Sequence, residues 1–428
     1  MDGNNKLSRI NNNDNNSRLM FAIIGLLAVL VIALCLYIFV FDKNEPEPAS
    51  EEISVVPETS ETGNTSEDEP EYSADESDPG ITSETESSTP EQSAEPVSEP
   101  VSVPEESSED VSEETSYDES DPEHGWIINN LGYTYLYNGK GLEQFTYSSA
   151  IAEKYASSLG NAASKCGSAN VYHILVPTNC EFLDIPRSIT QEDDFYCSSQ
   201  KNFTDKVYSL TDGKIVNINV YDAISKRIEN NDYVYYNTDP NYTQIGAYTV
   251  YTEFCKTAGL KAVSDTVYNL KVLDDTFLGR FYTATGSERL KKNSDILYYY
   301  DVDEAYASSE KVYRKSGVVN RDGVIFTDVP SYSYYCYLGE EAKRIDVATS
   351  TKSGKKILVI GDSSASPLVT LLVPHYDTIT FVNSTLQTEN ISELLGGGYD
   401  DVLIINYNTN AGRLVYKNIN SMAGASNE

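Results

Sequence analysis

The sequence predicts an α/β fold, with a mostly parallel β-sheet flanked by helices, over residues 124–428 of the 428-residue chain. Residues 356–363 (KILVIGDS) contain four consecutive aliphatic side chains without polar alternation, a pattern typical of a strand that is buried on both faces. Similar runs occur at residues 171–176 and 402–406, and stretches with helical spacing separate them. Strands that alternate with helices favour a parallel sheet, because each helical crossover lets the next strand run in the same direction.

The first elements of this domain are expected between its start and Pro177. Residues 133–137 (YTYLY) predict a strand, and the Asn-Gly-Lys-Gly sequence at 138–141 predicts a turn. Apolar residues recur every four positions from Tyr147 to Cys166, which indicates an amphipathic helix. Residues 171–176 then form a buried strand that Pro177 ends.

The remaining elements continue this alternation. Thr243 is a natural N-cap for a helix over residues 244–258. Residues 277–331 show poor periodicity and receive no element. The further strands that we expect are residues 214–220, 233–237, 357–360, 378–382 and 402–406.

The N-terminal part predicts a membrane anchor. Residues 19–41 contain no charge and no Pro, and 23 residues at ~1.5 Å each exceed the ~30 Å hydrocarbon core of a bilayer. Three basic residues precede this segment, and only Lys43 follows it closely. The positive-inside rule therefore predicts a cytoplasmic tail at residues 1–18, one transmembrane helix, and an extracellular C-terminal domain at the cell membrane.

Residues 42–123 predict a disordered acidic linker. From position 44 to 123 the chain has 28 Asp and Glu and no Lys or Arg, and it consists mainly of Glu, Ser, Pro and Thr. Such a segment cannot bury enough apolar surface to offset its chain entropy. We interpret it as a spacer, with a specific partner for the acidic run as the alternative.

Charge and cysteine spacing exclude several classes of function. The net charge of −35 comes mostly from the linker, and the rest offers no basic patch that would indicate nucleic acid. No C-x-x-C spacing predicts a metal site, and no phosphate-binding loop predicts a cofactor. Five cysteines follow the linker, so at least one thiol stays free or pairs between chains.

The tip of the strand at 356–361 carries the first candidate for chemistry. Gly361, Asp362 and Ser363 follow the buried strand, and reacting groups gather at the carboxyl ends of parallel strands. Ser363 is therefore a candidate nucleophile. The alternative is that Asp362 or Ser363 caps the next helix.

Two segments resemble a known family. Residues 235–248 (YYNTDPNYTQIGAY) are similar to the Tyr-Tyr-x-Thr-Asp-His-His-Trp-Thr-x-x-Gly-Ala-Tyr box of bacterial DHHW proteins, relatives of the alginate O-acetyltransferase-like branch of SGNH hydrolases. Residues 361–363, 371–376 and 400–404 are similar to the nucleophile block and closing strand of that family. The resemblance extends over roughly residues 130–410 and implies an SGNH-like α/β fold.

The resemblance also assigns roles to residues of the site. In that family the Asp and His of the box orient and supply a general base, and the Ser attacks an acyl group. Here Asp239 matches the Asp, while Asn241 occupies the place of the His. An amide cannot accept a proton at neutral pH, so Asn241 can hold Ser363 but cannot activate it. The substrate-binding positions that the resemblance implies are Gly361, Asp362, Tyr242, which replaces a Trp, and Thr385, which replaces an Arg.

The function expected from these residues is a catalytically impaired, membrane-anchored domain. It would bind a cell-envelope polysaccharide or assist envelope acylation proteins. One alternative is an active serine O-acetyltransferase or esterase, in which Asp239 or a substrate group helps as base and backbone N–H groups after Gly361 form an oxyanion hole. His173 or His375 could also replace the missing base, although His173 lies in mid-strand, where a satisfied core residue is expected, and the resemblance implies a non-catalytic role for the Pro-His-Tyr turn of His375. A surface adhesion or interaction module is the third possibility.

Overall fold

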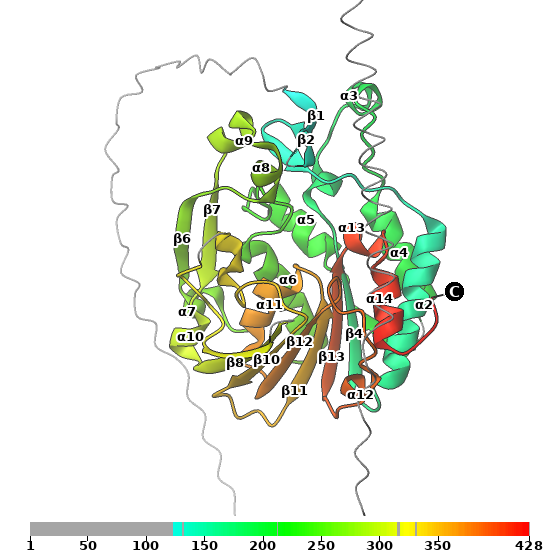
Figure 1. Cartoon of the computed structure of the whole chain (residues 1–428), viewed down its shortest axis with the longest axis vertical. Coiled ribbons are helices and arrows are strands. Elements are labelled where there is room, and N and C mark those ends of the chain that lie inside the picture. The colour runs from blue at the N-terminus through cyan, green and yellow to red at the C-terminus, as the bar shows by residue number, and fades with distance from the viewer. Residues whose placement is uncertain (1–122, 131, 212, 315–316, 330–331, 428) are drawn as a thin grey trace, which may run out of the picture. The chain divides into compact units, whose positions relative to one another are not determined.

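The computed structural model describes residues 123–427, except 131, 212, 315–316 and 330–331. An eight-stranded sheet has the order β5-β4-β13-β11-β12-β10-β8-β9 (Figure 1). The strands, in that order, are Ile215–Asn217, Asn170–Val176, Asp401–Tyr407, Lys356–Gly361, Thr378–Asn383, Arg344–Thr349, Ser308–Arg314 and Gly317–Asp322. The α/β fold class is therefore confirmed.

The sheet is mixed rather than mostly parallel. The four pairings from β5 to β12 are parallel, and the three pairings that join β12, β10, β8 and β9 are antiparallel. β10 runs antiparallel to both of its neighbours, β12 and β8. The prediction of a mostly parallel sheet is correct for five strands and wrong for the other three.

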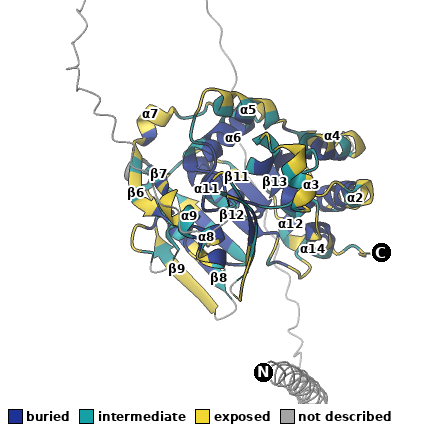
Figure 2. Cartoon of the chain, turned by 90° about the horizontal axis from the view of Figure 1, so that it is seen from above, coloured by how far each residue is buried: buried dark blue, intermediate teal, exposed yellow. Residues whose placement is uncertain are grey.

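Helices cover both faces of the parallel strands, as Figure 2 shows from above. One face packs against α5, α6 and α11, and the other against α2, α4 and α14. These helices are Tyr221–Glu229, Gln244–Thr257, Ala365–Leu372, Ser149–Lys165, Gln200–Leu210 and Val415–Met422. The Thr243 side chain accepts a hydrogen bond from the Gly246 N–H, so the predicted N-cap of α6 is confirmed.

β11 shows why its sequence lacks alternation. Ile357 and Val359 belong to the hydrophobic cluster on the α6 and α11 side. Leu358 and Ile360 belong to the cluster on the α2 and α14 side. All four side chains are fully buried, so the strand has no polar face.

Smaller elements complete the described domain, and the three-stranded sheet lies beyond the carboxyl ends of the parallel strands (Figure 1). A three-stranded sheet consists of β1 (His124–Ile128), β2 (Tyr133–Tyr137) and β3 (Lys140–Leu142), and a hairpin of β6 (Leu270–Phe277) and β7 (Asp295–Tyr300). The short helices are α3 (Arg187–Glu192), α7 (Asp265–Tyr268), α8 (Arg280–Thr285), α9 (Glu288–Lys292), α10 (Val302–Ala305), α12 (Ser392–Leu395) and α13 (Asn408–Ala411), with 3₁₀ turns η2 (Asn179–Phe182) and η3 (Ser333–Cys336).

Two predicted strands differ from the structure. Residues 233–237 form no strand, because the chain turns back and Tyr235 pairs with Tyr242 in an isolated bridge. The strand predicted at 214–220 is limited to β5. The other predicted strands and helices lie within two or three residues of their expected bounds.

Among the described residues the cysteines form one disulfide, between Cys180 and Cys197, and Cys166, Cys255 and Cys336 are free and buried. Across residues 123–427, apart from the gaps above, no helix is both long and apolar enough to span a bilayer. The expected tail at 1–18, transmembrane helix at 19–41 and linker at 42–123 fall outside the described residues, except for the last linker residue, and stay predictions.

Candidate functional site

The loop that carries Ser363 begins where β11 ends. A Cβ atom on Gly361 would lie 2.7 Å from the Cβ of Ala365 and 2.8 Å from the carbonyl oxygen of Ile405. Neither neighbour can retreat, because one lies in α11 and the other in β13. Gly361 therefore allows the end of β11 to lie this close to α11 and β13.

Asp362 holds this loop in place. Its Oδ1 accepts hydrogen bonds from the N–H and hydroxyl of Ser364, at 3.0 and 2.6 Å. Its Oδ2 accepts from the N–H of Tyr407 at 2.8 Å and from Asn410 Nδ2 at 2.7 Å. Asp362 is 1% exposed, so its carboxylate connects the end of β11 to the end of β13.

The structure brings Ser363, Asn241 and Asp239 together in series. The Ser363 hydroxyl donates to Asn241 Oδ1 at 2.8 Å, and Asn241 Nδ2 donates to Asp239 Oδ1 at 2.7 Å. Asn241 and Asp239 are each 1% exposed, while Ser363 is half-buried. The order of contacts is the one that the family resemblance implied for a Ser, a base and an Asp.

The acceptor and donor atoms of the Asn241 amide lie where the two nitrogens of a neutral imidazole would lie. It presents an acceptor to Ser363 and a donor to Asp239. The reverse orientation would set the amide oxygen against a carboxylate, two acceptors without a proton between them. The arrangement can therefore position the Ser363 hydroxyl, but Asn241 cannot take its proton.

The second oxygen of Asp239 is held by residues that the sequence did not single out. Oδ2 accepts from the Arg280 N–H at 2.9 Å and from the hydroxyl of Tyr332. The Arg280 guanidinium also pairs with Glu341 at 2.7 Å. The Tyr-rich run at 332–337 (YSYYCY) was the available signal, but nothing in the sequence linked it to the box at 235–248.

Tyr242 and Thr385 occupy different surroundings. Tyr242 is fully buried, its hydroxyl donates to the carbonyl of Ser364, and its N–H donates to the hydroxyl of Tyr407 at 2.9 Å. Tyr242 therefore holds the Ser363 loop in place through the Ser364 carbonyl. Thr385 is exposed, and its hydroxyl donates to Asn383 Oδ1 at 2.7 Å. Asn383 in turn lines the cavity at Ser363.

The three histidines of the described residues are engaged elsewhere. His173 bonds to Asn217 and Tyr155, at 3.0 and 3.2 Å, and His375 bonds to the hydroxyl of Tyr251 at 2.6 Å. Burial lowers the pKa of both imidazoles to about 4. His124 pairs with Asp193. None of these partners is Ser363, Asn241 or Asp239.

The space at Ser363 is small. Its cavity measures about 20 Å³ and is lined by Ser363, Ser366, Arg280, Tyr334, Tyr335 and Asn383, among others. That volume holds about one water molecule. The backbone N–H of Ser364, one donor of the expected oxyanion hole, is already bonded to Asp362.

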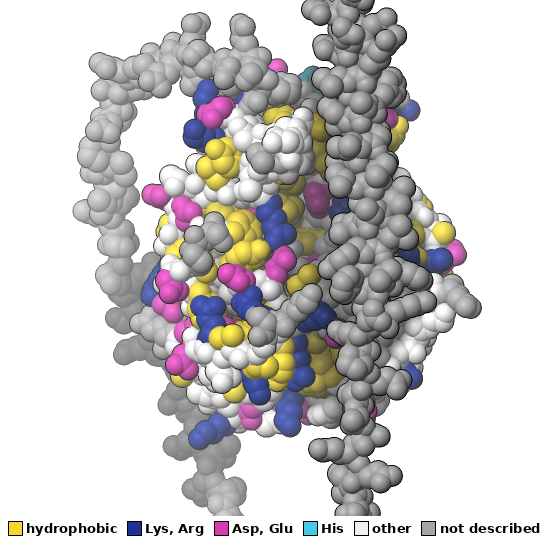
Figure 3. All heavy atoms as spheres, in the orientation of Figure 1, with side chains coloured by type: hydrophobic (Ala, Val, Ile, Leu, Met, Phe, Trp, Pro, Cys, Tyr) yellow, Lys and Arg dark blue, Asp and Glu magenta, His cyan; other side chains and the backbone are white. Residues whose placement is uncertain are grey.

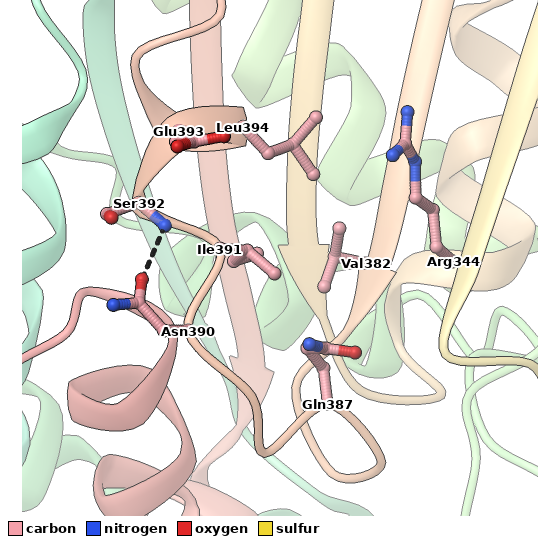
Figure 4. Close-up of a pocket in the computed structure, with 8 residues that line it drawn as sticks. All are labelled: Arg344, Val382, Gln387, Asn390, Ile391, Ser392, Glu393 and Leu394. Carbon is pink, nitrogen blue, oxygen red and sulfur yellow. Dashed lines mark hydrogen bonds between the residues drawn. The ribbon is translucent and has the colours of Figure 1, made fainter. Parts of the chain in front are cut away.

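Several larger hollows lie outside this cavity, including two of similar volume. One measures about 520 Å³ and includes Pro240 and Arg280, so it borders the Asp239–Asn241 segment. The other measures about 530 Å³ and contains none of the site residues discussed above (Figure 4). Arg344 on its rim is held by a bidentate pair with Asp346, both bonds at 2.8 Å.

No metal cluster is found among the described residues: three or more His, Cys, Asp or Glu side chains do not gather there in an arrangement that could hold an ion. The site thus consists of a serine, an amide and a carboxylate in series, on an α/β sheet, beneath a Tyr-rich segment. This arrangement resembles the serine, base and carboxylate series of serine hydrolases and acyltransferases, with an amide in the place of the base.

A sequence model of the DHHW protein family matches residues 63–382, three quarters of the chain. The chain therefore belongs to the DHHW protein family, as residues 235–248 and 361–363 predicted. No curated protein matches the chain.

Solved structures resemble this chain at low sequence identity, and the first two share its fold. A DHHW family protein from Eubacterium siraeum is 21% identical with a TM-score of 0.59, over 69% of this chain and 96% of that one. Bacillus cereus PatB1 is 14% identical with a TM-score of 0.54, over 69% and 99%. The O-acetyltransferase domain of Pseudomonas putida AlgJ is 9% identical with a TM-score of 0.37, over 70% and 99%.

Proposed function

We propose that this chain is a catalytically impaired DHHW protein that binds a cell-envelope polysaccharide, or assists its acylation, without turning it over. The observation that carries the proposal is the 2.8 Å hydrogen bond from Ser363 to the amide oxygen of Asn241. The site keeps the contacts that position a nucleophile and lacks a group that could deprotonate it.

A serine hydroxyl is a poor nucleophile unless an adjacent base takes its proton. Removing the base of a comparable catalytic unit lowers the rate by on the order of a million-fold. Asp239 is not a substitute, since its two oxygens receive four hydrogen bonds from Asn241, Arg280 and Tyr332.

Covalent labelling with a sulfonyl fluoride, read by intact mass, tests this proposal on the full chain. A structure of PatB1 carries a sulfonyl adduct, which makes this probe suitable for the fold. We expect no adduct on the wild-type chain and a stoichiometric adduct on Asn241→His. The double variant Asn241→His with Ser363→Ala controls for labelling elsewhere.

A stoichiometric adduct on Ser363 of the wild-type chain would contradict the proposal. Some other group would then activate the hydroxyl, and the active O-acetyltransferase or esterase becomes the better interpretation. A specific feature favours this second candidate: the Ser363 hydroxyl is retained and lines a cavity.

Retention of envelope polysaccharide separates the remaining roles. A binding protein retains polysaccharide in a sedimentation assay, and Ser363→Ala leaves that retention unchanged. An accessory protein retains little polysaccharide but co-purifies with an envelope acylation protein. A surface adhesion module shows neither behaviour and binds intact cells or host surfaces instead.

We also propose that residues 19–41 anchor the chain in the cell membrane, with residues 42–123 as a spacer and the α/β domain outside. The absence of charge in residues 19–41 and the excess of basic residues before them support this topology. Protease treatment of intact cells tests it, because the domain should be released while residues 1–18 stay protected. A protected domain would overturn the proposed orientation.

A further inference from the structure

A lysine amine and an asparagine amide lie in contact where β3 meets the segment that carries Asp239 and Asn241. The Nζ of Lys140 donates to Oδ1 of Asn237 at 2.8 Å. The amide carbon lies one C=O bond, ~1.2 Å, from that oxygen, so Nζ and Cγ are at most ~4 Å apart. Reaction requires atoms ~3–3.5 Å apart, a distance that a small rotation of either side chain reaches.

The backbones of both residues are held in this arrangement. Gly141 follows Lys140 in β3, and its N–H donates to the carbonyl of Asn237 at 2.8 Å. The N–H of Asn237 donates to Oδ1 of the buried Asp295 at 2.7 Å. The amine and the amide therefore stay together without a diffusional encounter, and well-oriented groups within one molecule reach effective concentrations of ~10⁵–10⁸ M.

The Lys140 amine lacks the acidic partner that would keep it charged. Among the residues that the structure describes, no carboxylate oxygen lies within ion-pairing distance of Nζ, and its hydrogen bond goes to a neutral amide. Burial lowers the pKa of Lys140, against the smaller opposing effect of the charge on Asp295. A larger share of this amine is therefore uncharged than for an exposed lysine, and the uncharged amine is the nucleophile.

The nitrogen of the Asn237 amide is not held in place. Its Nδ2 makes no hydrogen bond within the described part of the chain. Lys140 and Asn237 are both half-buried, so a small leaving group at this position can reach solvent. The pair therefore combines a nucleophile, an acyl carbon and a leaving group that can depart.

We propose that Lys140 and Asn237 become joined by an intramolecular amide bond, which the folded chain forms without another protein. The Nζ of Lys140 attacks Cγ of Asn237, a bond forms between these two atoms, and the bond from Cγ to Nδ2 breaks. One proton passes from Nζ to Nδ2, which leaves as ammonia with the electron pair of the broken bond. The reaction requires no oxidant, reductant or cofactor.

The bond ties β3 to the residue that lies two positions before Asp239. It fixes the start of the segment that places Asp239 and Asn241 beside Ser363, whether or not this site turns over a substrate. The inference therefore goes beyond the proposed function and does not depend on it.

Mass spectrometry of the full chain in detergent tests the inference. Reduction first opens the Cys180–Cys197 disulfide, so that its missing hydrogens do not alter the mass. We expect an intact mass ~17 Da below that of the sequence, which is the loss of one ammonia. Trypsin should fail to cleave after Lys140, and the digest should contain one branched peptide that carries both Lys140 and Asn237.

Two variants locate the bond. Lys140→Arg keeps the positive charge but removes the amine, and Asn237→Ala removes the amide carbon, so each should show the full mass of its sequence. Lys291→Arg is the matched control, because Lys291 is 53% exposed and pairs with Glu288 in α9. This control should keep the mass loss of the wild-type chain.

Two outcomes would overturn the inference. A wild-type mass equal to that of the sequence shows that the contact is an ordinary hydrogen bond. A mass loss that persists in Lys140→Arg and Asn237→Ala places the change elsewhere, as in a cyclic imide at Asn138, which precedes Gly139 and would lose ammonia as well. The mass and peptide map of the wild-type chain decide the question even if a variant fails to fold.

Discussion

The parallel and antiparallel halves of the eight-stranded sheet differ in how many of their faces are buried. β11 packs against helices on both faces, and its residues 357–360 are fully buried. In β10, Ile345 and Val347 are buried, whereas Arg344 and Asp346 are partly exposed on the other face. Figure 2 shows the same difference in burial between β11 and the exposed strand β9.

This difference shows which part of the sheet can position the side chains of a functional site. Only the parallel half directs several strand ends to one edge, where Ser363 and Asn410 follow β11 and β13. The antiparallel half leaves one face open, and Figure 3 shows Lys and Arg side chains among hydrophobic ones in the region of β8 and β10. The parallel half therefore positions a site, while the antiparallel half extends the sheet and offers surface.

Truncating a side chain in β11 should produce the largest loss of stability. Ile360 of β11 is fully buried in the hydrophobic cluster on the α2 and α14 side. Ile360→Ala should therefore lower the free energy of unfolding by about 2–5 kcal/mol. Val319 in β9 is 45% exposed, and Val319→Ala should cost less than about 0.5 kcal/mol. Denaturant unfolding measures both, and similar losses would contradict the contrast between the two halves.

An intermediate effect is expected from the one carboxylate buried in β8. Glu310 is 2% exposed, Arg321 lies 3.8 Å away, and neither carboxylate oxygen has a hydrogen bond among the described residues. Burial raises the pKa of Glu310 to about 8, above its value of about 4.5 in an unfolded chain. Its contribution to stability is therefore complete below pH 4.5 and is lost as pH rises towards 8.

Glu310→Gln tests this pH dependence. At about 1.4 kcal/mol per pKa unit, the wild-type chain should lose on the order of 3 kcal/mol between pH 5 and 9 that the variant keeps. Thermal melts across this range measure the difference. The same pH dependence in both proteins would show that Glu310 reaches solvent or a partner in the folded state.

The smallest effect is expected on the open face of the antiparallel half. Arg344 and Asp346 form a bidentate pair, but their side chains are 33% and 20% exposed. Asp346→Asn should lower stability by about 0.2–1 kcal/mol, and added salt should reduce this loss. A double-mutant cycle with Arg344→Gln isolates the pair, and a coupling of several kcal/mol would mean that this face is covered.

The sequence predicted the parallel half because burial on both faces leaves a local signature. The strands β11 and β13 follow from uninterrupted aliphatic runs, β12 (TITFVN) follows from its β-branched and aromatic residues, and α6 follows from Thr243 and its spacing. Of the antiparallel strands, β10 (RIDVAT) alternates polar and apolar residues over a short stretch, whereas β8 (SSEKVYR) and β9 (GVVNRD) show no such period. Their pairing depends on neighbours distant in the chain, so residues 277–331 gave no clear period.

The site was predicted in part, for a related reason. The family resemblance named Asp239, Asn241 and Ser363, and the structure places them in contact. Arg280 and Tyr332, which hold Asp239, come from segments 41 and 93 residues further along the chain. These groups come together only in the folded chain, and no spacing in the sequence predicts their contact.

The contacts of Asn241 also bear on how readily the site could change. Codons for asparagine and histidine differ in their first base alone, so one nucleotide substitution exchanges them. Ser363 and Asp239 already occupy the positions that an imidazole would address. A single nucleotide substitution would therefore place a histidine between Ser363 and Asp239.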